Sequence, residues 1–111
     1  MGAEEGTGLR ILVVRSWDLP IAPLREALTV AGLRAELIRV DIEPALVAAL
    51  GRRNIDAIIY APGTRGIPFA VVKGLVDELG LDVPVVTFGE DDDVAAVAAQ
   101  LAAATRARAP S

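Results

Sequence analysis

Four short apolar runs alternate with four longer segments of helical periodicity along this chain. The runs read LRILVV, AELIRV, IDAIIYA and VPVVTF, at residues 9–14, 35–40, 55–61 and 83–88. Short aliphatic runs bounded by turn residues are typical of buried strands. In the segment after each run, apolar residues recur every three or four positions, which indicates a helix. The pattern therefore predicts four strand–helix units.

The four helical segments carry recognisable start and stop signals. They read PLREALTVAG, EPALVAALG, FAVVKGLVDELG and DDDVAAVAAQLAAATRAR, at residues 23–32, 43–51, 69–80 and 91–108. The first three end in glycine, the commonest C-cap residue, and the second has Pro44 in its first turn, where no hydrogen bond is lost. The fourth begins with acids and ends with arginines, as the helix macrodipole favours. These signals support a helix in every segment.

Strict alternation with short connections predicts an α/β fold, a flavodoxin-like three-layer sandwich with a parallel sheet. Right-handed crossovers place successive helices on the two faces of such a sheet. We expect the strand order 2-1-3-4, one domain over residues 9–105, a flexible leader over residues 1–8 and a tail or linker stub over residues 106–111. Ligands of open α/β sheets bind where the carboxyl ends of the strands meet. Here that edge would hold RSWD, APGTRG and GEDDD, at residues 15–18, 61–66 and 89–93.

The composition excludes most kinds of catalytic residue at this edge. The 111 residues include no Cys and no His, so thiolate nucleophiles, disulfides and the usual general base near neutral pH are all absent. The net charge is −4, and one Trp, one Tyr and two Phe offer little for stacking on bases, so we expect no nucleic-acid partner. No apolar run approaches the length of a membrane span. We expect a cytoplasmic protein that binds neither metal nor cofactor.

In the order and spacing of its units the chain resembles the response-regulator receiver domains, which accept a phosphoryl group on an aspartate. The similarity covers most of residues 9–100. It implies an acidic pair for Mg²⁺ directly after the first strand, but Arg15 and Ser16 stand there. It implies a phosphoacceptor aspartate at the end of the third strand, but that position falls on Ala61. Thr87 matches the switch Ser or Thr of the family, whereas the lysine after a fifth strand has no counterpart.

These departures imply a pseudo-receiver, a receiver scaffold that signals by binding in a two-component-type pathway of bacteria. A carboxylate accepts a phosphoryl group only when a divalent cation neutralises the oxygens, and Arg15 places positive charge where the ligands would be. We therefore expect no enzymatic activity. The alternative is a residual receiver with a displaced acceptor at Asp18, Asp56 or one of Asp91–Asp93, although Asp56 lies at the wrong end of its strand.

Other interpretations of the same edge stay open. Arg15 and Arg65, with the backbone amides of PGTRG, would suit an anion or nucleotide, but the loop lacks the Walker A lysine and spacing. Trp17 serves either as an anchor for a protein partner or as a cap on the core. The acids Glu90–Asp93 suit a helix N-terminus better than a metal site. The candidate anion or partner loop comprises Arg15, Trp17, Pro62, Gly63, Thr64, Arg65 and Gly66.

The fourth helical segment has no charged residue between Asp93 and Arg106. A surface helix normally carries charges on its outer face, and the strand before this one would form the open edge of the sheet. We therefore expect a protein partner or a second copy of the chain to cover the fourth helix and the edge of the fourth strand. Within the helix, Val94, Val97 and Leu101 are expected to face the core. The predicted interface comprises Val85, Ala95, Ala98, Ala99, Ala102 and Ala103.

Overall fold

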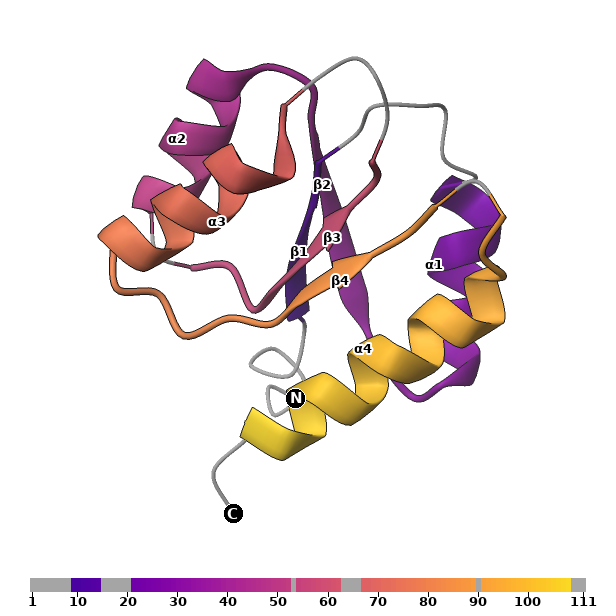
Figure 1. The fold of residues 1–111 in the computed structure, drawn as a ribbon. Coiled ribbons are helices and arrows are strands. Elements are labelled where there is room, and N and C mark those ends of the chain that lie inside the picture. The colour runs from indigo at the N-terminus through magenta and orange to yellow at the C-terminus, as the bar shows by residue number, and fades with distance from the viewer. Residues whose placement is uncertain (1–8, 15–20, 53, 63–66, 90, 109–111) are drawn as a thin grey trace.

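The computed structural model describes residues 9–14, 21–52, 54–62, 67–89 and 91–108 (Figure 1). Its strands are β1 (Leu9–Val14), β2 (Ala35–Val40), β3 (Ala57–Tyr60) and β4 (Val85–Thr87). Its helices are α1 (Ile21–Val30), α2 (Glu43–Gly51), α3 (Phe69–Glu78) and α4 (Val94–Arg108). The predicted alternation of strand and helix is confirmed, and the bounds of β1, β2 and α2 agree with the sequence pattern.

The four strands form one parallel sheet in the order β2-β1-β3-β4, as predicted. β1 lies in the middle, paired with β2 on one side and β3 on the other, and β3 pairs with β4. α1 and α4 cover one face of the sheet, and α2 and α3 cover the other (Figure 1). The chain therefore has the expected α/β three-layer architecture of the flavodoxin-like type.

Alternate side chains of the central strands supply two separate cores. Between the sheet and the α1–α4 layer, Ile11 and Val13 of β1 are fully buried, and Leu12 and Val14 are fully buried on the opposite side. A strand covered on both faces has no position for a polar side chain, which is why β1 from Ile11 onward and β3 are continuous apolar runs. The α1–α4 core includes Leu24, Leu28, Ile59, Phe88, Val97 and Leu101. The α2–α3 core includes Leu46, Leu50, Ile58, Tyr60, Val72 and Val76.

The amino edge of the sheet is fastened by Asp56, just before β3. The Arg10 N–H donates to Asp56 Oδ2 at 2.8 Å, and the Asp56 N–H donates to the Arg10 carbonyl at 2.7 Å. The guanidinium of Arg10 also lies 3.7 Å from the Glu36 carboxylate. Asp56 is thus at the opposite edge from the strand ends where receiver chemistry would occur, as the sequence indicated.

Two glycines end α1 and α3 in the left-handed conformation predicted for C-caps. Gly32 has φ +89° and Gly80 has φ +68°. After α1, the Leu33 N–H donates to the Leu28 carbonyl at 2.9 Å, and after α3 the Leu81 N–H donates to the Val76 carbonyl at 3.0 Å. These are the long hydrogen bonds of the Schellman motif, which satisfy the last carbonyls and turn the chain back toward the sheet.

Candidate functional site

The candidate site is the carboxyl edge of the sheet, where β1, β3 and β4 end. The predicted loop residues Arg15, Ser16, Trp17, Asp18, Gly63, Thr64, Arg65 and Gly66, with Glu90, lie outside the described residues. The described part of this edge comes from the end of β3, the start of α3 and the segment that joins β4 to α4.

Ala61, which occupies the position of the expected phosphoacceptor, is fully buried. It follows β3 directly and extends the pairing with β1, because its N–H donates to the Val14 carbonyl at 2.8 Å. Its methyl group packs in the α1–α4 core. A buried methyl group offers neither a nucleophile nor a metal ligand. Pro62, the next residue, is exposed and has no N–H to donate.

Tyr60 fixes the end of β3 to the chain ahead of α3. Its Oη donates to the Ile67 carbonyl at 2.7 Å, and its ring meets the edge of the Phe69 ring at a centroid distance of 5.2 Å and an angle of 62°. Burial raises the pKa of the Tyr60 hydroxyl above its ordinary value. The hydroxyl is therefore a structural donor. In the sequence, this hydrogen bond is indicated only by a single tyrosine within an apolar strand, since a buried phenol needs a hydrogen-bond partner.

Thr87, the predicted switch residue, is exposed at the end of β4 and lies opposite Tyr60 in the sheet register. The Phe88 N–H donates to the Tyr60 carbonyl at 2.8 Å, so the strand pairing continues past Thr87. Val86 and Phe88, on either side, pack in the α1–α4 core. Because side chains alternate along a strand, the Thr87 hydroxyl lies on the α2–α3 side of the edge.

Asp92, one of the acids before α4, binds a main-chain group of its own turn. The Gly89 N–H donates to Asp92 Oδ2 at 2.8 Å, and the Asp92 N–H donates to the Gly89 carbonyl at 3.0 Å. The Asp93 carbonyl then accepts from the Val97 N–H at 3.0 Å, which begins the helical hydrogen bonding of α4. The Asp92 carboxylate thus stabilises the turn that leads into α4. Among the described residues, no three acidic side chains gather in a way that would hold a metal ion.

The predicted interface on α4 is only partly on the surface. Ala98 is 1% exposed and Ala102 is 3% exposed, so both belong to the core of the chain and are unavailable to a partner. They follow the same helical stripe as Val97 and Leu101, which face the sheet as predicted. The exposed members of the predicted set are Ala95, Ala99 and Ala103, while Val85 is half-buried. The prediction was wrong for Ala98 and Ala102 because every residue of this face is an alanine or a larger aliphatic, so polarity does not mark where the core ends.

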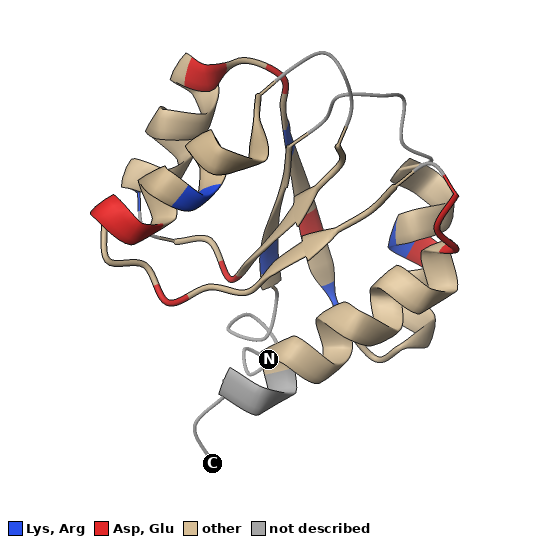
Figure 2. Cartoon of the chain, in the orientation of Figure 1, with Lys and Arg blue, Asp and Glu red and all other residues tan. Residues whose placement is uncertain are grey.

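Charge is distributed unevenly around α4 (Figure 2). The helix is uncharged from Val94 to Thr105, whereas three exposed aspartates, Asp91, Asp92 and Asp93, precede it. Between α1 and α4 runs an open groove of about 420 Å³. Pro23, Glu26, Ala27, Val30 and Ala31 of the α1 segment and Val94, Ala95 and Ala99 of α4 line this α1–α4 groove.

Comparison with protein families, curated proteins and solved structures finds no match to this chain. Within the part of the chain that the structure describes, none of the helices has the length and apolar character needed to cross a membrane.

Proposed function

We propose that this protein is a non-catalytic pseudo-receiver that signals by binding other proteins. The observation that carries the proposal is the fully buried Ala61 at the strand end where the receiver resemblance requires a phosphoacceptor. In the sequence, Arg15 and Ser16 stand in place of the acidic metal pair. Phosphoryl transfer to a carboxylate needs both a nucleophile and a cation, so the loss of both parts favours signalling without catalysis.

Two of the candidate carboxylates, Asp56 and Asp92, support this proposal over a displaced phosphoacceptor. Asp56 is engaged at the amino edge by the Arg10 N–H, far along the strand from the carboxyl edge. Asp92 accepts a hydrogen bond from the Gly89 N–H within its own turn. Both carboxylates have structural roles that explain their presence. The proposal places the protein in the cytoplasm of bacteria, in a two-component-type pathway, with no cofactor.

The proposed binding surface is α4 together with the outer edge of β4, met by a partner protein or by a second copy. Among the described residues, β4 pairs with β3 alone, so its outer edge is open. An open edge of a parallel sheet exposes unpaired N–H and C=O groups, which proteins usually cover. On α4, Ala103 and Gln100 are exposed and uncharged, which leaves that surface free for a partner to approach closely.

The proposal is tested by incubating the chain with a small phosphodonor and Mg²⁺ and measuring the intact mass. We expect no phosphoryl adduct, while an active receiver domain treated in parallel gains one. Mg²⁺ alone should leave the melting temperature unchanged, since an ion that binds only the folded state must raise it. An acid-labile adduct, lost in Asp91→Asn or Asp93→Asn, would contradict the proposal and identify the displaced acceptor.

A further inference from the structure

The α1–α4 groove has the shape and composition of a docking site for a helix. Pro23, Glu26, Ala27, Val30 and Ala31 follow one another at intervals of three, one, three and one positions, a continuous stripe along α1. From Pro23 to Ala31 this stripe is about 12 Å long, which matches two turns of an approaching helix. On the opposite side of the groove, Ala95 and Ala99 have small side chains, so the backbone of an incoming helix can come close to α4.

The floor and walls of the groove are largely apolar. Val30 is 83% exposed, the most exposed of the large hydrophobic residues in the described structure. Covering it would remove apolar area from water and stabilise a complex. The main-chain groups of both walls are engaged in their own helices, so an extended peptide would find no strand edge to pair with here. An amphipathic helix is therefore the occupant that fits this surface.

The charges around the groove favour a positively charged helix as its occupant. Glu26 is the one charged residue among those that line it, and within the described residues it makes no ion pair. Asp93 precedes Val94 at one end of the groove. Arg25 adjoins Glu26 in sequence, but it lies about 100° around α1 and does not line the groove. A second copy of this chain would bring the same acids against themselves, whereas a cationic helix would pair with them.

We infer that the α1–α4 groove binds an amphipathic helix of a partner protein, with aliphatic residues on one stripe and lysine or arginine beside it. The inference rests on the proposed function, that the chain signals by binding proteins, and adds the α1–α4 groove as a second surface beside α4 and the edge of β4. The aliphatic stripe packs on Val30 and the alanines, and the cations meet Glu26 and the aspartates ahead of α4. The β4 edge, on the other side of α4 from α1, stays available for a separate contact.

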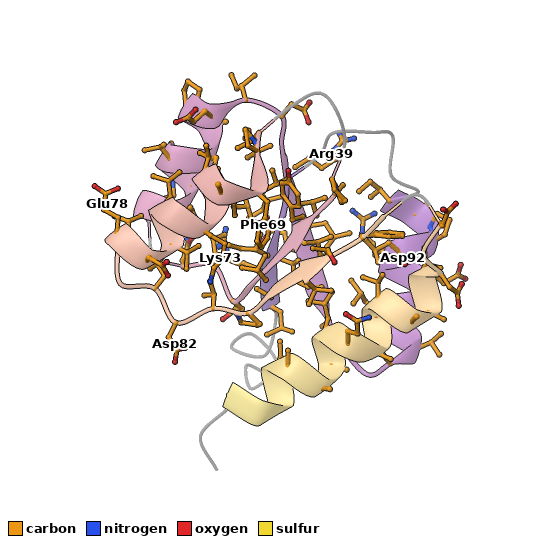
Figure 3. The ribbon with its side chains drawn as sticks, viewed as in Figure 1. Arg39, Phe69, Lys73, Glu78, Asp82 and Asp92 are labelled. Carbon is orange, nitrogen blue, oxygen red and sulfur yellow. The ribbon has the colours of Figure 1, made fainter. Side chains whose placement is uncertain are left out.

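The test uses two synthetic helical peptides that share a leucine stripe and differ only in lysines or glutamates beside it. We expect the lysine peptide to bind the isotope-labelled chain, with amide shifts confined to residues 23–31 and 94–99. The glutamate peptide should not bind. Glu26→Lys should weaken the lysine peptide about tenfold and allow the glutamate peptide to bind. The matched control is Glu78→Lys on α3, an exposed glutamate on the opposite face (Figure 3), which changes the net charge equally and should leave both affinities unchanged.

Each contrary outcome overturns the inference. Failure of the lysine peptide to bind, equal binding of both peptides, or equal effects of Glu26→Lys and Glu78→Lys would do so. Self-association of the wild type that is lost in Val30→Lys would show that a second copy fills the groove instead, because Val30 lines the groove from α1 and is no part of the α4 and β4 edge surface. These results leave the pseudo-receiver proposal intact, since that proposal is tested separately by the phosphoryl adduct and by the response to Mg²⁺.

Discussion

The Tyr60 hydroxyl is a small group with a defined structural task at the carboxyl edge. It ties the end of β3 to the Ile67 carbonyl, 2.7 Å away, and thereby sets where the chain enters α3. Tyr60→Phe removes the hydroxyl and leaves a buried carbonyl without that donor. We expect a loss of about 1 kcal/mol in the free energy of unfolding, measured by urea denaturation at neutral pH. An unchanged urea midpoint would mean that water replaces the phenol without cost.

The same residue should make the folded state sensitive to alkaline pH. Burial raises the pKa of Tyr60 in the folded protein, so the unfolded chain loses this proton first as the pH rises. Its contribution to stability is therefore complete below about pH 10 and is lost as the pH passes through the raised pKa. Urea midpoints of the wild type should fall over this range more steeply than those of Tyr60→Phe. Because Tyr60 is the only tyrosine, its ionisation can be followed by absorbance, and parallel curves for the two proteins would contradict the assignment.

At the scale of single elements, α3 offers a matched pair of glycines. Gly74 lies inside the helix and Gly80 ends the turn after it with φ +68°, and a Cβ at either would meet nothing within 4 Å. The backbone conformation alone then decides whether an alanine raises or lowers the free energy of unfolding. Gly74→Ala should raise the free energy of unfolding by about 0.5–1 kcal/mol, and Gly80→Ala should lower it by about 1 kcal/mol. Thermal melts of both variants test this, and a shift in the same direction for both would refute it.

Along α4, two adjacent alanines should respond in opposite ways to the same substitution. Ala102 is 3% exposed against the sheet, and Ala103 is exposed. Ala102→Glu buries a carboxylate without a partner and should cost more than about 3 kcal/mol or prevent folding. Ala103→Glu should leave the melting temperature within a few degrees of the wild type. Equal losses would mean that α4 packs with a different face on the sheet.

The sequence predicted the helical elements better than their faces. Capping signals located the ends of α1 and α3, because Gly32 and Gly80 need the left-handed conformation that they adopt, whereas Gly51 is the last residue of α2 and Arg52 caps that helix in the right-handed conformation. In α4 every position between Val94 and Ala104 is aliphatic or alanine except Gln100, so periodicity could not separate Ala98 and Ala102 from the outer alanines. Distinguishing them required the packing of Val97 and Leu101 on the sheet.

At the scale of the whole molecule, the open side of β4 should govern assembly. If a second copy covers this edge and the outer face of α4, sedimentation will show reversible dimers whose fraction rises with concentration. Ala103→Glu should then dissociate them while the circular dichroism spectrum stays that of the wild type. A wild type that sediments as a monomer at every concentration would contradict the homodimer. A different protein would then be the expected partner of the β4 edge.

The topology followed from the sequence because alternating units with short connections admit few arrangements. The order β2-β1-β3-β4 needs only right-handed crossovers and helices on both faces. The chemistry of the edge was less accessible. The Tyr60 hydrogen bond to Ile67 and the turn formed by Gly89 and Asp92 depend on how neighbouring segments meet in space. The α1–α4 groove joins residues some seventy positions apart, which no local pattern reveals.

Because the interior is divided into two cores, the two cores can form one after the other during synthesis, the α2–α3 core before the α1–α4 core. All buried members of the α2–α3 core lie between Leu12 and Val76, whereas the α1–α4 core ends only with Leu101. A ribosome makes the chain from its N-terminus, so one side of the sheet can be closed while the other, which α1 covers only in part, still awaits α4. We expect nascent chains that end before Val94 to expose this second side, as apolar dye binding to stalled chains would report. Until α4 emerges, the part of that sheet face that α1 leaves open is where a chaperone would be needed.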